Sequence, residues 1–266
     1  CPRQRISRRN HHLSVRPRRA LYHQRNPLNA MIRKILPAIV LLLTALSSAA
    51  QNNFDKIRRE KPDFDQIRRE INDRNSDYYY PRLMAEYERN DTLMKLDKFR
   101  YLYLGYSLQE DYNPYRQPSV SNSTAFDISR AKLTPQECDT VIKYANLALD
   151  DNPFDLNQMH VLISAYKQRH NFKMAAIWQY KFNYILMAIV STGTGMDEEN
   201  AWYVIEPQHE YVLLNVMGYT VTNHLFYEPY YEYLTVVDGA GRQNGGYYFN
   251  IHHVLEEYYR KFPEEL

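Results

Sequence analysis

An apolar segment near the start of the chain separates two parts with different chemistry. Residues 35–46 form a short apolar run that follows a basic pair and precedes small residues at the spacing that a signal peptidase needs. These three parts are typical of a cleavable secretory signal. We therefore predict a signal peptide over residues 31–50, with cleavage between Ala50 and Gln51. The alternative is a membrane anchor, which needs about 20 apolar residues, more than this run provides.

The part before the signal is strongly basic, and its charge hides the acidity of the rest. Residues 1–30 contain eight arginines and no acidic residue, so we expect a leader that does not fold or a start that is set too early. Ten of the 33 basic side chains precede residue 51, whereas all 31 acidic ones follow it, so residues 51–266 carry a net charge of −8. An acidic chain is repelled by phosphate, and we expect no nucleic-acid partner.

The expected mature chain has 216 residues and must be stable without a disulfide. Cys138 is its only cysteine, and it is predicted in the first turn of a helix, where the helix dipole lowers the pKa of a thiol. We nevertheless interpret Cys138 as structural, because no catalytic signature surrounds it. Tyrosine is abundant, with 24 of the 25 after residue 50. Tyrosine rings suit half-buried packing and binding surfaces.

The first two thirds of the mature chain show helical periodicity. Two similar phrases, FDKIRRE and FDQIRRE, could each form one or two helical turns, and we assign residues 51–133 to a helical segment with a proline-containing loop. Thr134, Pro135 and Glu137 form a capping-box pattern that predicts a helix start. Two further helices are expected before residue 192, and the segment STGTG ends the last of them.

Residues 193–266 have a different pattern. Four stretches rich in tyrosine and β-branched residues are expected as strands, and the glycine-rich loop DGAGRQNGG is expected to connect two of them. The stretch HEYVLLNVMG is ambiguous, and HHVLEEYYRKF is predicted as a closing helix. The fold class is therefore α+β, with helices first, then a small antiparallel sheet and a C-terminal helix.

Residues 134–189 resemble a tetratricopeptide-type helical hairpin. Small residues at 145 and 148 precede Asn152-Pro153, and larger apolar residues follow at the spacing of that repeat. The pattern departs from the repeat at Ile163 and Gln179. Any antiparallel helical hairpin needs small residues where its helices cross, so this simpler interpretation is equally open.

Five segments of the mature chain carry a family resemblance: the block from Asp77 to Tyr115, NPFD at 152–155, and the short motifs STGTG, HEYVLLNVMG and YYFNI. In these segments the chain resembles an exported bacterial family, domain of unknown function 4919. This resemblance implies an envelope protein of Gram-negative bacteria and no particular activity.

Candidate catalytic groups are few. Glu210, Asp238 and His253 are the residues that could supply acid–base chemistry, and each also has a structural interpretation. His209 and Glu210 are neighbours in sequence, so their side chains would need separate partners. A hydrolase would require at least two of Glu210, Asp238 and the His252/His253 region in one cleft.

Cofactor and metal sites are not expected from the sequence. No dinucleotide or phosphate-binding loop is present. His252 and His253 each precede a glutamate by four residues, but such pairs are usually solvated helix contacts, whereas zinc needs three or four ligands. We therefore predict no cofactor and no metal.

The sequence favours a non-enzymatic envelope protein, periplasmic or secreted, that binds a protein or peptide. Tyr166, Trp178, Tyr248 and Asn250 are the candidate binding residues. The alternative is a hydrolase that acts on an envelope polymer or glycan. No membrane anchor is expected after cleavage, and no oligomeric state is predicted.

Overall fold

The computed structural model describes residues 54, 56–115 and 132–265. The leader, the predicted signal peptide and its cleavage site at Ala50–Gln51 lie outside the described residues. Within the described ranges, no helix combines the length and the apolar character that a membrane crossing requires.

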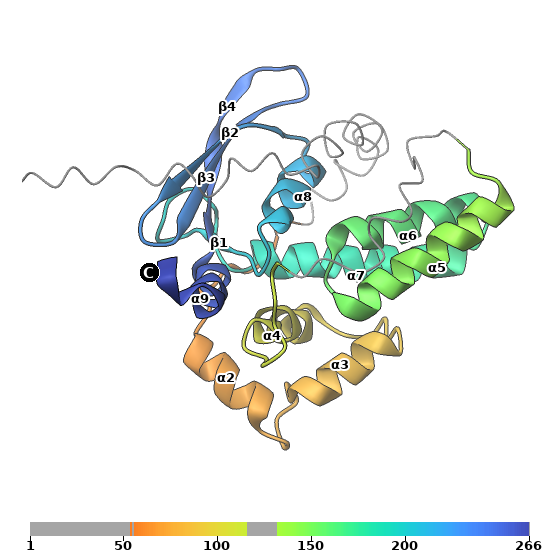
Figure 1. The fold of residues 1–266 in the computed structure, drawn as a ribbon, viewed down its shortest axis with the longest axis horizontal. Coiled ribbons are helices and arrows are strands. Elements are labelled where there is room, and N and C mark those ends of the chain that lie inside the picture. The colour runs from red at the N-terminus through yellow and green to blue at the C-terminus, as the bar shows by residue number, and fades with distance from the viewer. Residues whose placement is uncertain (1–53, 55, 116–131, 266) are drawn as a thin grey trace, which may run out of the picture.

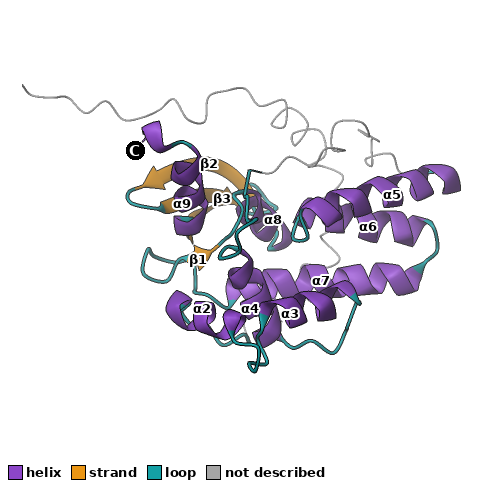
Figure 2. Ribbon diagram, turned by 60° about the horizontal axis from the view of Figure 1, so that its bottom comes forward, coloured by secondary structure: helices purple, strands orange, loops and turns teal. Residues whose placement is uncertain are grey.

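Three short helices form the first layer of the fold (Figure 1). They are α2 (Phe64–Asn72), α3 (Tyr80–Glu88) and α4 (Leu96–Tyr106). The second of the two similar phrases forms α2, whereas residues 58–60 of the first have no regular secondary structure. α4 is buried along most of its length, and Figure 2 shows it beside the long helix α7.

A helical hairpin stack forms the second part: α5 (Pro135–Asp151), α6 (Leu156–Gln168) and α7 (Phe172–Val190). The predicted capping box is present, because Thr134 Oγ1 accepts from Glu137 N–H and the Glu137 carboxylate accepts from Thr134 N–H. α6 packs against both α5 and α7. The helical hairpin expected at 134–189 is therefore confirmed.

The third part is a small sheet with two helices. Its elements are β1 (Trp202–Tyr203), α8 (Gln208–Val216), β2 (Thr220–Tyr227), β3 (Tyr231–Val237), β4 (Gln243–Asn250), α9 (His252–Lys261) and the 3₁₀ helix η1 (Pro263–Glu265). The strand order is β1-β4-β3-β2, with β1 parallel to β4 and the other pairs antiparallel. The α+β class is confirmed, but the sheet is mixed, because residues AWYVIE contribute a two-residue strand that runs alongside β4.

α8 is the element that connects these parts. The ambiguous stretch HEYVLLNVMG forms this helix, which lies between the sheet and the α5–α7 stack (Figure 1). It contacts β2 on one side and α6 on the other. Both of its neighbouring polar residues, His209 and Glu210, are almost fully buried. α8 thus directs one polar side chain into each half of the core.

Candidate functional site

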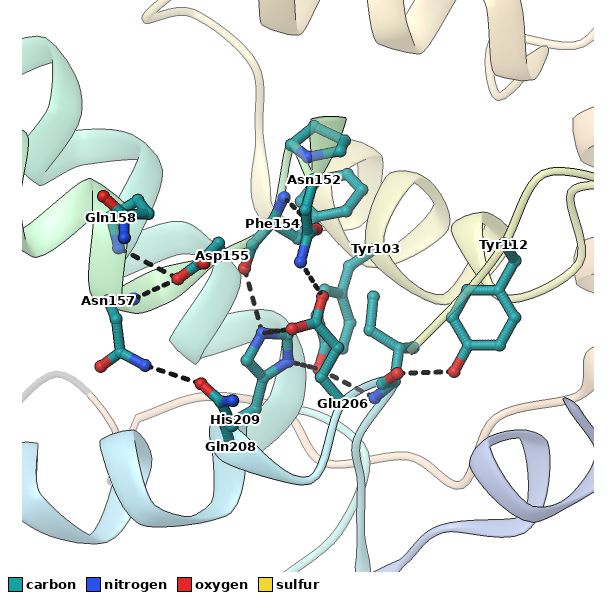
Figure 3. A network of polar contacts seen from close by, with 12 residues as sticks. Tyr103, Tyr112, Asn152, Phe154, Asp155, Asn157, Gln158, Glu206, Gln208 and His209 are labelled. Atoms are coloured by element: carbon teal, nitrogen blue, oxygen red, sulfur yellow. Dashed lines mark hydrogen bonds and ion pairs between the residues drawn. The ribbon is translucent and has the colours of Figure 1, made fainter. Parts of the chain in front are cut away.

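A buried polar network surrounds His209 (Figure 3). Tyr103 of α4 donates its hydroxyl proton to His209 Nδ1 over 2.8 Å, and His209 Nε2 donates to the carbonyl oxygen of Phe154 over 3.0 Å. A carbonyl oxygen can only accept, so Nε2 carries the imidazole proton and Nδ1 is the acceptor. Burial lowers the pKa of His209 to about 3, which keeps the ring neutral.

The same network includes a protonated glutamate. Glu206 Oε1 accepts from Asn152 Nδ2 over 2.8 Å, and the side chain is 7 % exposed. Burial, and then the negative charge of Asp155, raise the pKa of Glu206 to about 8. Glu206 Oε2 lies 3.7 Å from His209 Nε2. Because both groups are neutral at pH 7, this contact is not a salt bridge.

The NPFD motif at the α5–α6 corner supplies the partners of this network. Asn152 bonds Glu206, the Pro153 carbonyl accepts from the Tyr87 hydroxyl over 2.9 Å, and the Phe154 carbonyl accepts from His209. Asp155 caps α6 by accepting from two of its first N–H groups. These hydrogen bonds connect the α5–α6 loop to α3, to α8 and the residues just before it, and to the first turn of α6. The network has a structural role, because its polar groups are buried and form hydrogen bonds with one another.

A second polar cluster lies on the opposite side of α8. It consists of Glu210 of α8, His224 of β2 and Glu232 of β3, which we call the carboxylate–histidine trio. One ligand atom from each residue lies within 4.8 Å of the other two. Glu210 and Glu232 are 0 % and 1 % exposed, and His224 Nε2 is 3.1 Å from Glu232 Oε2. The Tyr211 hydroxyl lies 3.2 Å from His224 Nδ1.

The register of the β2–β3 hairpin creates the trio. His224 pairs with Leu234, and Phe226 pairs with Glu232, so His224 and Glu232 lie diagonally on the same face of the sheet. That face carries the buried residues of β3, whose exposure alternates along the strand. α8 covers this face and brings Glu210 to it.

Glu210 has an unusual environment within the trio. Among the described residues, no donor forms a hydrogen bond to either of its carboxylate oxygens. Burial, and then the neighbouring Glu232 carboxyl, raise the pKa of Glu210 well above its ordinary value. Two buried carboxyl groups in contact cannot both be ionised without a cation between them.

The other candidate acid–base residues have separate partners. Asp238 lies in the β3–β4 turn, where the backbone N–H and the guanidinium of Arg242 lower the pKa of its carboxyl. His253 Nδ1 of α9 is 2.6 Å from Glu256 Oε2. The expected partner of His253, Glu257, instead bonds Arg260. Glu210, Asp238 and His253 therefore each contact different residues.

The groups on α9 line an open cleft of about 450 Å³ beside the end of α4. His252 Nε2 and His253 Nδ1 both approach Glu256, at 3.6 and 2.6 Å. These three residues form a second group with ligand atoms close enough to share a metal ion. Because the side chains of His252 and Glu256 are 44 % and 56 % exposed, water can solvate these two without a metal, although Nε2 of His253 is buried without a hydrogen-bond partner among the described residues.

The candidate binding residues lie in three different environments. Trp178 is buried, and the Lys181 ammonium lies 4.4 Å from its ring centroid, while Tyr166 packs half-buried against the core. Asn250 is also buried, and its side chain accepts from His252 N–H at the start of α9. Tyr248 is half-buried on the outer face of the sheet.

The outer face of the sheet carries three tyrosines in contact, Tyr227, Tyr233 and Tyr248, which we call the tyrosine platform. Ring centroids of Tyr233 and Tyr248 are 4.6 Å apart, and Tyr227 lies 6.0 Å from Tyr248. Gly246 permits this arrangement, because a Cβ at that position would lie 2.6 Å from the Tyr233 ring. Of these three tyrosines, only Tyr248 was predicted from the sequence as a binding residue.

Cys138 differs from the expectation for a helix N-terminus. The residue is buried in the first turn of α5, and this burial raises the pKa of the thiol instead of lowering it. Loss of solvation, and then the negative charge of Asp139, favour the protonated thiol. A protonated, buried thiol fits the structural role that the sequence suggested.

Comparison with known proteins identifies a family. The family model described as "Domain of unknown function (DUF4919)" matches residues 65–260, a range that contains the network, the trio and the tyrosine platform. No curated protein and no solved structure matches the chain. The tetratricopeptide likeness therefore stays a prediction. Because the match spans well over half of the sequence, the chain belongs to the DUF4919 family.

Proposed function

We propose that this chain is an exported envelope protein that binds an extended segment of another protein or a peptide along strand β2. The observation that carries the proposal is the character of that strand. β2 is the last strand of the sheet and pairs only with β3 among the described strands. An edge strand with free backbone groups is a template for an added strand.

The composition of β2 supports binding at this edge. Its eight residues, TVTNHLFY, include no lysine, arginine, acidic residue or proline, the residues with which edge strands usually avoid pairing. Leu225, Phe226 and Tyr227 are 40 %, 50 % and 39 % exposed. An added strand would satisfy the backbone of the edge and cover these side chains.

The tyrosine platform continues this surface. Leu225 of β2 pairs with Tyr233, and Tyr233 pairs with Tyr248, so all three lie on the outer face. Side chains of a segment added to β2 would alternate between the two faces. Those on the outer face would contact Leu225 and Tyr227, which contribute apolar area with little loss of side-chain entropy.

A site-specific crosslinking experiment tests the proposal. A photoreactive amino acid is placed at Leu225, and a control at Leu147 of α5, which is equally exposed at 40 %. We expect a crosslinked envelope protein or peptide from position 225 and none from position 147. The same products from both positions, or a crosslink from 225 only to this chain itself, would contradict the proposal.

Export to the envelope is tested separately. Mass spectrometry of the protein from the periplasmic fraction should give a mature N-terminus at Gln51. An intact segment 31–50, or recovery of the protein from the cytoplasm alone, would contradict export. The crosslinking result does not depend on this measurement.

A further inference from the structure

We propose that Glu210, His224 and Glu232 bind a divalent transition-metal ion of the zinc class, which fixes α8 onto the β2–β3 hairpin. The donor set of two carboxylates and one imidazole suits such an ion. Three protein ligands would leave one coordination position for water, since zinc sites of this kind are four-coordinate. The trio includes His224 of β2, but it lies on the face of the sheet that α8 covers, whereas the proposed function uses the free edge and the outer face.

The geometry of the trio supports a shared ion. Metal–ligand bonds of about 2.1 Å in a tetrahedron place ligand atoms ~3.4 Å apart. His224 Nε2 and Glu232 Oε2 are 3.1 Å apart, and all three ligand atoms lie within 4.8 Å of one another. Small side-chain rotations therefore suffice to close the site around an ion.

The burial of Glu210 provides independent support. Its side chain is 0 % exposed and points into the trio, yet neither oxygen accepts a hydrogen bond from the described residues. Buried carboxylates are costly unless they are paired or coordinate a metal. None of the ion pairs found in residues 54, 56–115 and 132–265 involves Glu210 and a lysine or arginine. A cation at the trio would remove this cost.

The surroundings of His224 match those of a metal ligand. Metal-bound histidines usually donate their second ring N–H to an oxygen, which orients the ring. The Tyr211 hydroxyl lies 3.2 Å from Nδ1 and can accept that bond when Nε2 binds the metal. The His224 side chain is 24 % exposed but its Nε2 is enclosed, so an ion would enter from the edge of the sheet when this side chain rotates outward.

Zinc titration of the full chain tests this site. The protein is treated with EDTA, dialysed and titrated with Zn²⁺ in a calorimeter, and Glu210→Gln and Glu232→Gln are measured in parallel. We expect wild type to bind one zinc ion more than either variant, or to bind it at least about tenfold more tightly. Leader histidines such as His11 and His12 are present in all three proteins, so the difference reports the trio.

Two further variants make the test specific. Tyr211→Phe keeps the three ligands and should weaken zinc binding by roughly tenfold. The double variant His252→Gln/Glu256→Gln removes the exposed group on α9 and should leave the titration of the trio unchanged. If zinc binding is lost in the double variant, or is the same in wild type and Glu210→Gln, the proposal is wrong.

Spectroscopy and folding controls complete the experiment. Co²⁺ in place of Zn²⁺ should give visible bands of a tetrahedral site in wild type that are missing in Glu232→Gln. Circular dichroism without metal establishes that each variant is folded. If a buried variant does not fold, His224→Gln on the exposed edge strand replaces it, and an unchanged cobalt spectrum in that variant would overturn the assignment.

Discussion

The two sides of α8 carry buried polar clusters that differ in how well their groups are satisfied. On one side, His209 has a partner for each ring nitrogen, and Glu206 is held by Asn152. On the other side, Glu210 is as deeply buried but accepts no hydrogen bond from the described residues. His209 and Glu210 are neighbours in sequence. The contrast between them therefore arises from the different hydrogen-bond partners on the two sides of α8.

The difference separates a structural role from a binding role. A network whose donors and acceptors are all used rigidifies the core and leaves nothing for a ligand. A buried group without a partner indicates either a missing ligand or a protonated acid. Substitutions in the His209 network should therefore reduce stability, whereas substitutions in the trio should change metal binding.

His209→Ala should have the largest effect on stability. The substitution leaves a cavity and removes the acceptor of the Tyr103 hydroxyl proton and the donor to the Phe154 carbonyl. We expect the free energy of unfolding to fall by roughly 3–5 kcal/mol. Urea denaturation at pH 7 measures this, with His170→Asn as the control. His170 is exposed and has a positive φ that asparagine tolerates, so its substitution should change stability by less than about 0.5 kcal/mol.

Glu206→Gln should change the pH dependence of stability. The pKa of Glu206 is about 8 in the folded protein and about 4.5 when unfolded, so the folded state holds an extra proton between these values. The free energy of unfolding contributed by this group therefore falls as pH rises from about 4.5 to 8. The variant lacks this fall and should be more stable than wild type at pH 9, by at most about 5 kcal/mol, since one pKa unit corresponds to about 1.4 kcal/mol.

The measurement for Glu206 is a series of urea denaturations from pH 5 to pH 9. Only the difference between wild type and variant is interpreted, because other groups titrate in both. A constant difference across this range would mean that Glu206 is ionised in the folded protein throughout. A difference that widens toward acid would have the wrong sign for a raised pKa.

Tyr103→Phe and Tyr211→Phe compare a hydroxyl from each cluster. The Tyr103 hydroxyl donates to His209 and accepts from Ile205 N–H over 3.2 Å, and all three groups are buried. Its loss should cost about 1–3 kcal/mol. The Tyr211 side chain is 36 % exposed, so water replaces its hydroxyl, and the cost in metal-free protein should stay below about 1 kcal/mol. If both substitutions lower the free energy of unfolding equally, in thermal or urea unfolding, the two clusters do not differ in their structural role.

The local elements of the fold could be predicted from the sequence. The pattern at Thr134, Pro135 and Glu137 predicted the start of α5, and the structure contains that capping box. The expectation that His209 and Glu210 have separate partners is also confirmed. Such predictions succeed because caps and helix faces depend on residues only a few positions apart.

The trio could not be predicted in the same way, because it depends on long-range geometry. His224 and Glu232 share a face only in the register of the β2–β3 hairpin, and a shift by one residue would separate them. One local signal was available. Glu232 alternates with Leu234 and Val236 along β3, so an acidic residue occupies an apolar face. Cys138 also differs from its prediction, because burial raises the pKa of the thiol, whereas the helix N-terminus was expected to lower it.

Among the substitutions of fully buried residues, Glu210→Gln should have the smallest effect on stability. Burial and the adjacent Glu232 raise the pKa of Glu210, so the metal-free protein holds a neutral acid that glutamine resembles in shape. The contact with the Glu232 carboxyl can be kept, because the glutamine amide still offers an N–H donor to it. We therefore expect the free energy of unfolding in EDTA at pH 6 to change by less than about 1 kcal/mol. A loss as large as that of His209→Ala would show that Glu210 stabilises the core as His209 does, and would remove the difference between the two sides of α8.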